Sequence, residues 1–151
     1  MSAYVDGLKM LARRELSELQ VRQRLARKGH QPDAIDEAVA RLREERALDD
    51  TRVAEAIART ETSIRGRGKV RVRMQIERAG ISKDTAKRAI DDVFGGIDDG
   101  ALLQSSLTKR LRGRETIADD REFQRIYRYL IGQGFESDQV MRALTARRRR
   151  E

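Results

Sequence analysis

Hydrophobic residues along this chain follow helical spacing, and one turn-and-helix pattern occurs three times. The pattern begins with a glycine and has an aspartate four residues later, an alanine nine residues later, and Val, Ile or Leu ten residues later. It starts at Gly29, Gly80 and Gly134, which are 51 and 54 residues apart in a chain of 151. Self-similarity of this kind indicates one structural unit used repeatedly. The sequence therefore predicts an all-α fold of three tandem three-helix repeats in an elongated, curved arrangement.

The three glycines suit the left-handed position at which many helices end, where a Cβ atom would be strained. In that closure, the residue that follows the glycine packs against the residue four positions before the glycine. The aspartate then falls in the first turn of the next helix, where the helix dipole favours negative charge. The pairs expected to meet are Leu25 with His30, Ile76 with Ile81, and Leu130 with Phe135.

The first unit is expected to cover residues 1–49 and to begin with an amphipathic helix over residues 4–15. The spacing of its apolar residues predicts a buried face made of Val5, Leu8, Leu11 and Ala12. Ser17, with Gln20 three positions later, has the sequence of a capping box and predicts the start of the second helix. The residues that this helix is expected to bury are Leu25 and either Leu19 or Val21.

A third helix is expected from about Pro32 to Arg46, and Asp50 is the expected N-cap of the helix that opens the second unit, residues 50–96. Alternating Arg and Val after Gly68 would also fit a strand of period two. Alignment on the repeat favours a helix instead, because Val72 and Ile76 match Val21 and Leu25 of the first unit. We expect this helix from about Lys69 to Ala79.

The third unit is expected to cover residues 97–151. Its first helix carries three leucines at helical spacing and ends in a basic segment that reaches Arg114. Asp119 or Asp120 is expected to start the second helix. The closing helix is expected to run from Ser137 into the basic tail at Arg147–Arg150, which should fray.

Composition narrows the classes of partner. The chain has 33 basic and 25 acidic residues, no cysteine and a single histidine. The absence of cysteine fits a reducing cytoplasm, and no apolar run approaches the roughly 20 residues that span a bilayer, so we expect a cytoplasmic protein with no membrane contact. A basic excess favours a polyanionic partner, most plausibly nucleic acid. The excess is uneven: residues 1–49 carry 10 basic and 9 acidic residues, residues 50–96 carry 11 and 7, and residues 97–151 carry 12 and 9.

Residue sets typical of catalysis are missing from the sequence. His30 occupies a turn position that holds Ile81 and Phe135 in the sister units, which indicates a packing or surface residue. Gly66-Arg67-Gly68-Lys69 lacks the spacing of a phosphate-cradling loop. We therefore expect no enzyme activity, no cofactor and no metal site.

The strongest binding signal is a basic block that contains no acidic residue between Ile64 and Ile76. Its two glycines allow close approach to the backbone, and Arg71 and Arg78 share one face of the expected helix. The alternative is an ordinary solvated surface. The candidate contact residues for nucleic acid or a nucleoprotein filament are Arg65, Arg67, Lys69, Arg71, Arg73 and Arg78, with Arg24, Arg27, Lys28, Lys109 and Arg110 from the other units.

Several segments resemble the RecX family, bacterial regulators of the RecA recombinase in DNA repair, recombination and the SOS response. They are Leu11-Ala12-Arg13-Arg14-Glu15-Leu16-Ser17, Arg24-Leu25-Ala26-Arg27-Lys28-Gly29, Leu48-Asp49-Asp50-Thr51-Arg52-Val53-Ala54 and Gly134-Phe135. The family favours Phe at the place of Val53 and a basic pair at the place of Gly132-Gln133. The resemblance implies three tandem three-helix repeats that bind the RecA–single-stranded-DNA filament, within its helical groove, and restrain ATP hydrolysis and strand exchange.

Two other functions stay open from the sequence. A free-standing duplex-DNA-binding protein would use helix-turn-helix-like units with a recognition helix in the major groove, and a helical scaffold would bind acidic proteins without DNA. The expected partners are accordingly the RecA filament and single-stranded DNA, with double-stranded DNA as the alternative, and the chain is expected to act as a monomer.

Overall fold

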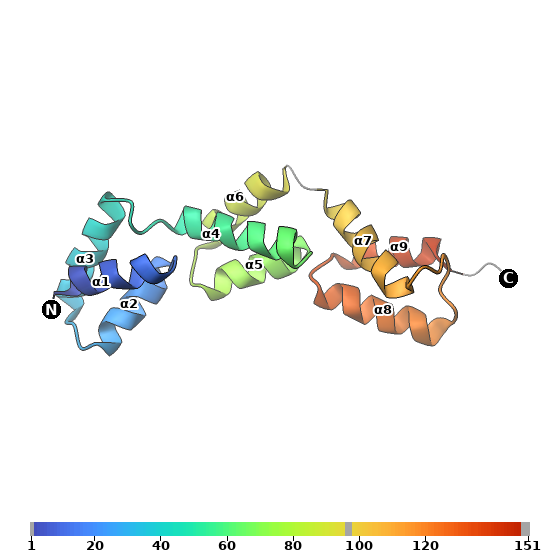
Figure 1. The fold of residues 1–151 in the computed structure, drawn as a ribbon, viewed down its shortest axis with the longest axis horizontal. Coiled ribbons are helices and arrows are strands. Elements are labelled where there is room, and N and C mark those ends of the chain that lie inside the picture. Colours follow the sequence, from blue (N-terminus) through green and yellow to red (C-terminus); the bar gives the residue numbers. More distant parts are fainter. Residues whose placement is uncertain (1, 96–97, 149–151) are drawn as a thin grey trace.

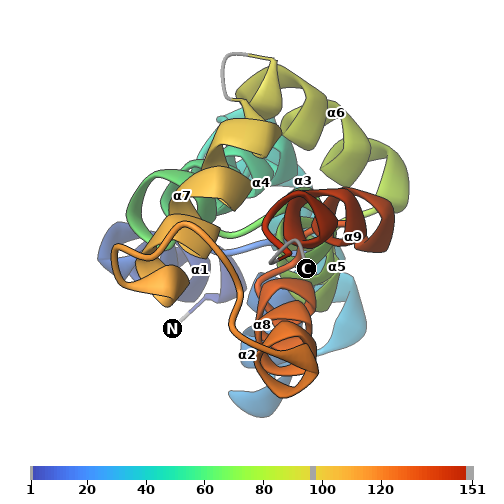
Figure 2. The ribbon, with the colours of Figure 1, turned by 90° about the vertical axis from the view of Figure 1, so that its right-hand side faces the viewer.

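The computed structural model describes residues 2–95 and 98–148, and within them the chain is helical with no strand. The helices form three groups of three that follow one another along an elongated row, with α1 in the group at one end and α9 in the group at the other (Figure 1). Seen along the row, the groups lie one behind another (Figure 2). The elements are α1 (Ala3–Arg13), α2 (Glu18–Arg27), α3 (Pro32–Glu44), α4 (Asp50–Arg59), a π-helical turn η1 (Thr60–Ile64), α5 (Lys69–Arg78), α6 (Lys83–Phe94), α7 (Asp99–Leu111), α8 (Asp120–Gly132) and α9 (Ser137–Ala146).

Each unit of three helices buries its own small core. The first core gathers around Leu25 and Leu42, the second around Val72 and Ile76, and the third around Leu130, all of which are fully buried. Among the described residues these cores are separate clusters, with Leu102 packed against both the second and the third. The row is therefore held together by local contacts between neighbours, as in other repeat proteins. The predicted architecture of three tandem three-helix repeats is therefore confirmed. The predicted boundary at residues 96 and 97 lies outside the described residues.

The repeated glycines end the second helix of each unit as predicted. Gly29, Gly80 and Gly134 have φ values of 94°, 84° and 99°. Two of the closures show the six-residue hydrogen bond of a Schellman turn: the main-chain nitrogens of His30 and Phe135 donate to the oxygens of Leu25 (3.2 Å) and Leu130 (3.3 Å). The capping box of Ser17 and Gln20 is also present.

The two joints between units repeat the same contact. The residue before α2, Ser17, donates its hydroxyl to the main-chain oxygen of Ala79, next to Gly80. The residue before α5, Gly68, donates its main-chain N–H to the oxygen of Gln133, next to Gly134, at 2.9 Å. The start of the second helix in one unit thus sits on the glycine turn of the next unit. Because the contact recurs in the same register, the row is a regular repeat rather than three loosely tethered domains.

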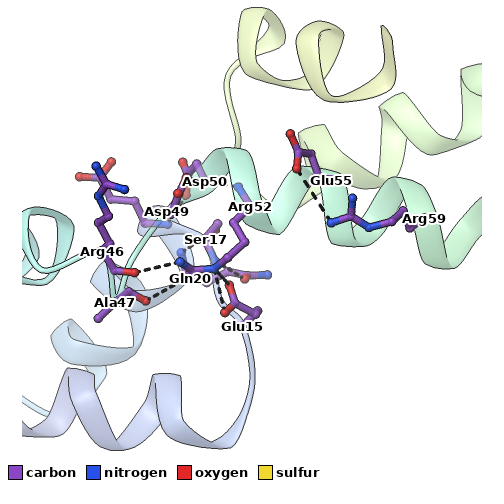
Figure 3. A network of polar contacts seen from close by, with 11 residues as sticks. Glu15, Ser17, Gln20, Arg46, Ala47, Asp49, Asp50, Arg52, Glu55 and Arg59 are labelled. Atoms are coloured by element: carbon purple, nitrogen blue, oxygen red, sulfur yellow. Dashed lines mark hydrogen bonds and ion pairs between the residues drawn. The ribbon is translucent and has the colours of Figure 1, made fainter. Parts of the chain in front are cut away.

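Arg52 of α4 reinforces the first joint (Figure 3). Its guanidinium donates to the main-chain oxygens of Arg46 at 2.9 Å and Ala47 at 3.1 Å, and its Nε lies 3.1 Å from the Glu15 carboxylate. These groups come from the end of the first unit, the α1–α2 loop and α4, so one side chain ties three segments together. Multiple hydrogen bonds from one planar guanidinium fix orientation as well as distance.

The predicted buried face of the first helix is wrong at three of its four residues, since only Leu11 is partly buried and packs against the core. Val5 and Leu8 are each 37% exposed, and Ala12 is exposed. The helix instead buries Ala3, Asp6 and Gly7. A Cβ at Gly7 would lie 2.7 Å from Leu42 Cδ1, so the absence of a side chain lets α1 approach α3 closely, and this close approach decides the rotation of the helix.

Two local predictions also change, and one open alternative is decided. Asp49 rather than Asp50 is the N-cap of α4 and accepts from the main-chain N of Arg52 at 3.2 Å. Val21, not Leu19, is buried beside Leu25. The last helix ends at Ala146, and the main-chain oxygen of Arg147 accepts from Ile117 N at 2.8 Å, which draws the chain away from the helix axis. Arg149 and Arg150 lie outside the described residues.

Candidate nucleic-acid and filament interface

The basic block of the second unit divides into residues that hold the fold and residues that face solvent. Arg65 is exposed and lies 3.5 Å from Glu61, four residues earlier on η1. Arg67 is half-buried, and its Nε and Nη1 are buried without a hydrogen-bond partner among the described residues. The block contains no acidic residue of its own, but the π-helical turn before it supplies one.

Arg71 belongs to the joint between the second and third units. Its Nη1 donates to the main-chain oxygen of Gly132 at 2.9 Å, while the neighbouring Val70 N donates to the oxygen of Gly134 at 3.0 Å. A Cβ at Gly134 would collide with the Cβ of Arg71. The first turn of α5 therefore packs through Val70 and Arg71 against the backbone of the third unit, while Lys69 in the same turn is exposed.

Lys69, Arg73 and Arg78 are the exposed members of the block on α5. The Lys69 ammonium lies 5.5 Å from the centre of the Phe94 ring, and burial raises the pKa of the Asp99 carboxyl while the nearby Lys69 charge opposes that rise. Lys69 and Arg73 line an open cavity of 650 Å³ between α5 and α6, together with Lys83 and Lys87. Four carboxylates line the same cavity, so its charge is balanced.

Arg71 and Arg78 line a second groove, of 330 Å³, beside Ile131 and Met74. This position confirms that the two arginines share a face of α5. In the third unit, Lys109 and Arg110 are exposed on α7, and the Arg110 guanidinium lies 3.5 Å from the centre of the Tyr129 ring, a cation–π distance.

A nearby arginine of the third unit is structural. Arg114 donates from Nη1 and Nη2 to the two carboxylate oxygens of Glu122, at 2.8 and 2.7 Å, and Ala118 N donates to the same carboxylate at 3.1 Å. The Arg114 guanidinium, and then the Ala118 N–H, lower the pKa of Glu122 to about 2. The bidentate pair closes the loop that leads into α8.

The candidate residues of the first unit lie together at a groove between α1 and α2. The groove has a volume of 360 Å³ and is lined by Arg24, Arg27 and Lys28. The structure adds Lys9, Arg13 and Arg14 from α1 and its C-cap, which the sequence did not single out. The sequence signal for these residues is the three basic residues within positions 9–14. It was concealed because the net charge of residues 1–49 as a whole is close to zero.

Asp6 is the one carboxylate among the described residues that line this groove, and it is 6% exposed. One of its oxygens lies 2.6 Å from His30 Nε2, and the other lies 3.4 Å from the Lys28 ammonium. The hydrogen bond from His30 is the main reason that the pKa of Asp6 is lowered. His30, expected to be a packing or surface residue, therefore joins the end of α2 to α1.

Within the part of the chain that the structure describes, no group of three or more His, Asp or Glu side chains is placed to hold a metal ion. No helix in that same part combines the length and apolar composition needed to cross a membrane.

Comparison with known proteins agrees with this geometry unit by unit. The models of the first, second and third three-helix domains of RecX match residues 3–42, 49–90 and 98–144. The chain is 35% identical to the regulatory protein RecX of Halorhodospira halophila, over 93% of this chain and 84% of that one. It is 33% identical to the protein of the same name from Chromohalobacter salexigens, over 92% and 88% of the two chains.

Among solved structures, the crystal structure of RecX from Lactobacillus salivarius superposes with a TM-score of 0.78 and 19% identity, and the match covers 95% of this chain and 94% of that one. At 19% identity, the superposition shows that the two proteins share a fold. Fold and surface together define a tandem helical-repeat protein with exposed cations in each unit. Within that class, the chain belongs to the RecX family, whose matched relatives are named regulatory proteins.

Proposed function

We propose that this protein regulates the RecA recombinase by binding the RecA–single-stranded-DNA filament along its helical groove and restraining ATP hydrolysis and strand exchange. Family membership gives the class of partner. The observation that carries the mode of binding is the repeated joint: Ser17 on Ala79 and Gly68 on Gln133 hold three units in one regular, elongated row. Such rows present an extended surface that can follow a helical groove.

Exposed cations at intervals along the row provide the contacts. On α5 the proposed contacts are Lys69, Arg73 and Arg78, with Arg65 just before the helix, and on α7 they are Lys109 and Arg110. Arg67 and Arg71 act mainly through the joint, because Arg71 is bonded to the third unit and the Arg67 guanidinium is largely buried. Protein in the groove would exclude a second DNA strand and slow the filament's cycle of growth.

Duplex reading by a helix-turn-helix unit is less compatible with this geometry. A recognition helix contacts base edges with its N-terminal residues, and in the N-terminal turn of α5 Val70 and Arg71 are bonded to the third unit. Co-sedimentation separates the two functions. The chain should pellet with preassembled RecA filament at a salt concentration that leaves little of it on naked single-stranded or duplex DNA of the same length. Equal or tighter binding to naked duplex would contradict the proposal.

A further inference from the structure

The groove between α1 and α2 gathers six cations in the unit whose net charge is lowest. They are Lys9, Arg13, Arg14, Arg24, Arg27 and Lys28. We propose that this groove binds the phosphodiester backbone of nucleic acid and is the principal phosphate site of the chain. The inference rests on the proposed function only for the kind of partner; the site itself follows from how the fold distributes charge.

Charge in the first unit is segregated by ion pairs on its other faces. Glu18 holds both Arg22 and Arg43, at 3.4 and 2.5 Å, and Asp36 lies 2.7 Å from Arg22. Glu45 pairs with Arg41, and Glu15 turns toward Arg52 of the second unit. Four of the nine acidic residues of this unit are therefore engaged in ion pairs away from the groove. A unit with 10 basic and 9 acidic residues consequently carries one strongly cationic face.

The single carboxylate of the groove is already compensated. Asp6 is buried and held by Lys28 and His30, so it anchors one of the cations rather than repelling a phosphate. Arg13, Arg14, Arg24 and Arg27 are exposed around it. Guanidinium groups at the rim of a shallow groove offer the paired N–H donors that phosphate oxygens accept.

The groove also lies beside a glycine turn that no other described unit covers. In the second unit, the glycine turn is covered: a Cβ at Gly80 would collide with Leu19 of the first unit. At Gly29, the corresponding turn of the first unit, no atom lies within 4 Å of where a Cβ would stand. Arg24, Arg27 and Lys28, at the end of α2 beside this turn, are exposed.

The lining favours nucleic acid over an acidic protein surface. Protein interfaces bury an apolar centre surrounded by a polar rim, and Met10 is the one apolar side chain among the described residues that line this groove. Phosphate contacts need no apolar centre, since their free energy comes largely from released counterions. A groove lined by six cationic side chains and a single apolar residue among the described residues therefore fits a phosphate backbone.

The test uses the full-length chain and a fluorescein-labelled 20-nucleotide single strand, with the matching duplex in a second arm. The variant is R13Q/R24Q/R27Q, which removes three exposed charges and keeps good helix formers. Fluorescence anisotropy over a salt series should show the dissociation constant raised by about tenfold or more near 0.1 M salt. The log–log salt slope for the single strand should become shallower by about 2, at roughly 0.7 per lost phosphate contact.

The matched control is R88Q/R121Q/R128Q, which removes three exposed arginines outside the groove. An equal loss in the control would show a general charge effect and overturn the site. Unchanged binding of R13Q/R24Q/R27Q to both naked DNAs would also overturn it. RecA does not enter this measurement, so if the proposed function failed, the groove would still be tested on its own.

Discussion

The Arg71 guanidinium donates to the main-chain oxygen of Gly132, 61 residues further along the chain, at a distance of 2.9 Å. This bond places part of the basic block inside the joint between the second and third units. Positive charge in that segment therefore has two uses: Arg71 fastens neighbouring repeats, whereas Arg73, two residues later, faces solvent.

Replacing Arg71 by Met should loosen this joint. The change keeps most of the stem against Gly134 and removes the donor, so we expect a loss of about 1 kcal/mol in unfolding free energy, the usual net value of one hydrogen bond. Chemical denaturation followed by circular dichroism measures it. Small-angle scattering should also show a broader range of extension. An Arg71→Met variant as stable as the parent would mean that the bond to Gly132 contributes nothing to the joint.

Arg73→Met is the matched change on the exposed face of the same helix. We expect unchanged unfolding free energy, because Arg73 is exposed and lies outside the joint, and weaker binding to the RecA filament. Filament co-sedimentation at fixed salt gives the comparison with Arg71→Met. If Arg73→Met bound like the parent chain, the exposed face of α5 would be excluded from the contact surface.

The three repeat glycines should differ in their tolerance of alanine. All three have positive φ, so each replacement carries the cost of a left-handed residue, about 1 kcal/mol. At Gly29 nothing else stands in the way, but at Gly134 the new methyl group would meet Arg71 and the backbone of Gly68. Gly134→Ala should therefore destabilise by at least about 2 kcal/mol more than Gly29→Ala. Equal losses of unfolding free energy for the two variants in urea denaturation would show that the joint accommodates the methyl group and would contradict this prediction.

Acid should weaken the third unit through Glu122. Its pKa in the folded chain is lowered to about 2, from an ordinary value of 4.5. A depressed carboxyl pKa stabilises the fold above the unfolded-state value, and this contribution is lost as pH falls from 4.5 toward 2. The contribution is at most about 3 kcal/mol. Glu122→Gln should lower stability at pH 7 and approach the parent near pH 2; parallel stability curves for the two chains over this range would contradict the assignment.

The fold could be predicted because its signals are local. A glycine at the end of each second helix, an aspartate in the following turn and the apolar pair across it, such as Leu130 with Phe135, lie within a dozen residues of one another. Turns specified by such local signals do not depend on contacts with the neighbouring units. The same signals also predicted the start of α5 at Lys69, against the alternating Arg and Val that resemble a strand.

What could not be predicted depends on contacts between distant segments. The rotation of α1 follows from the fit of Gly7 against Leu42, and the burial of Asp6 follows from His30, 24 residues away. Both partners, Leu42 and His30, lie outside α1, so the sequence of α1 does not reveal these contacts. The charge count of the first unit also concealed its cationic groove. A count does not show that acidic residues such as Asp36 lie on another face of the folded unit, where Asp36 pairs with Arg22.

Hydrolysis of ATP by RecA on single-stranded DNA tests the central claim most directly. The filament is formed first, and the protein is then added in increasing amounts while the hydrolysis rate is followed. A row of three units lodged in the filament groove should lower the rate at amounts well below one per recombinase, and an R13Q/R24Q/R27Q variant should require more protein for the same effect. An unchanged hydrolysis rate at saturating protein would contradict the account.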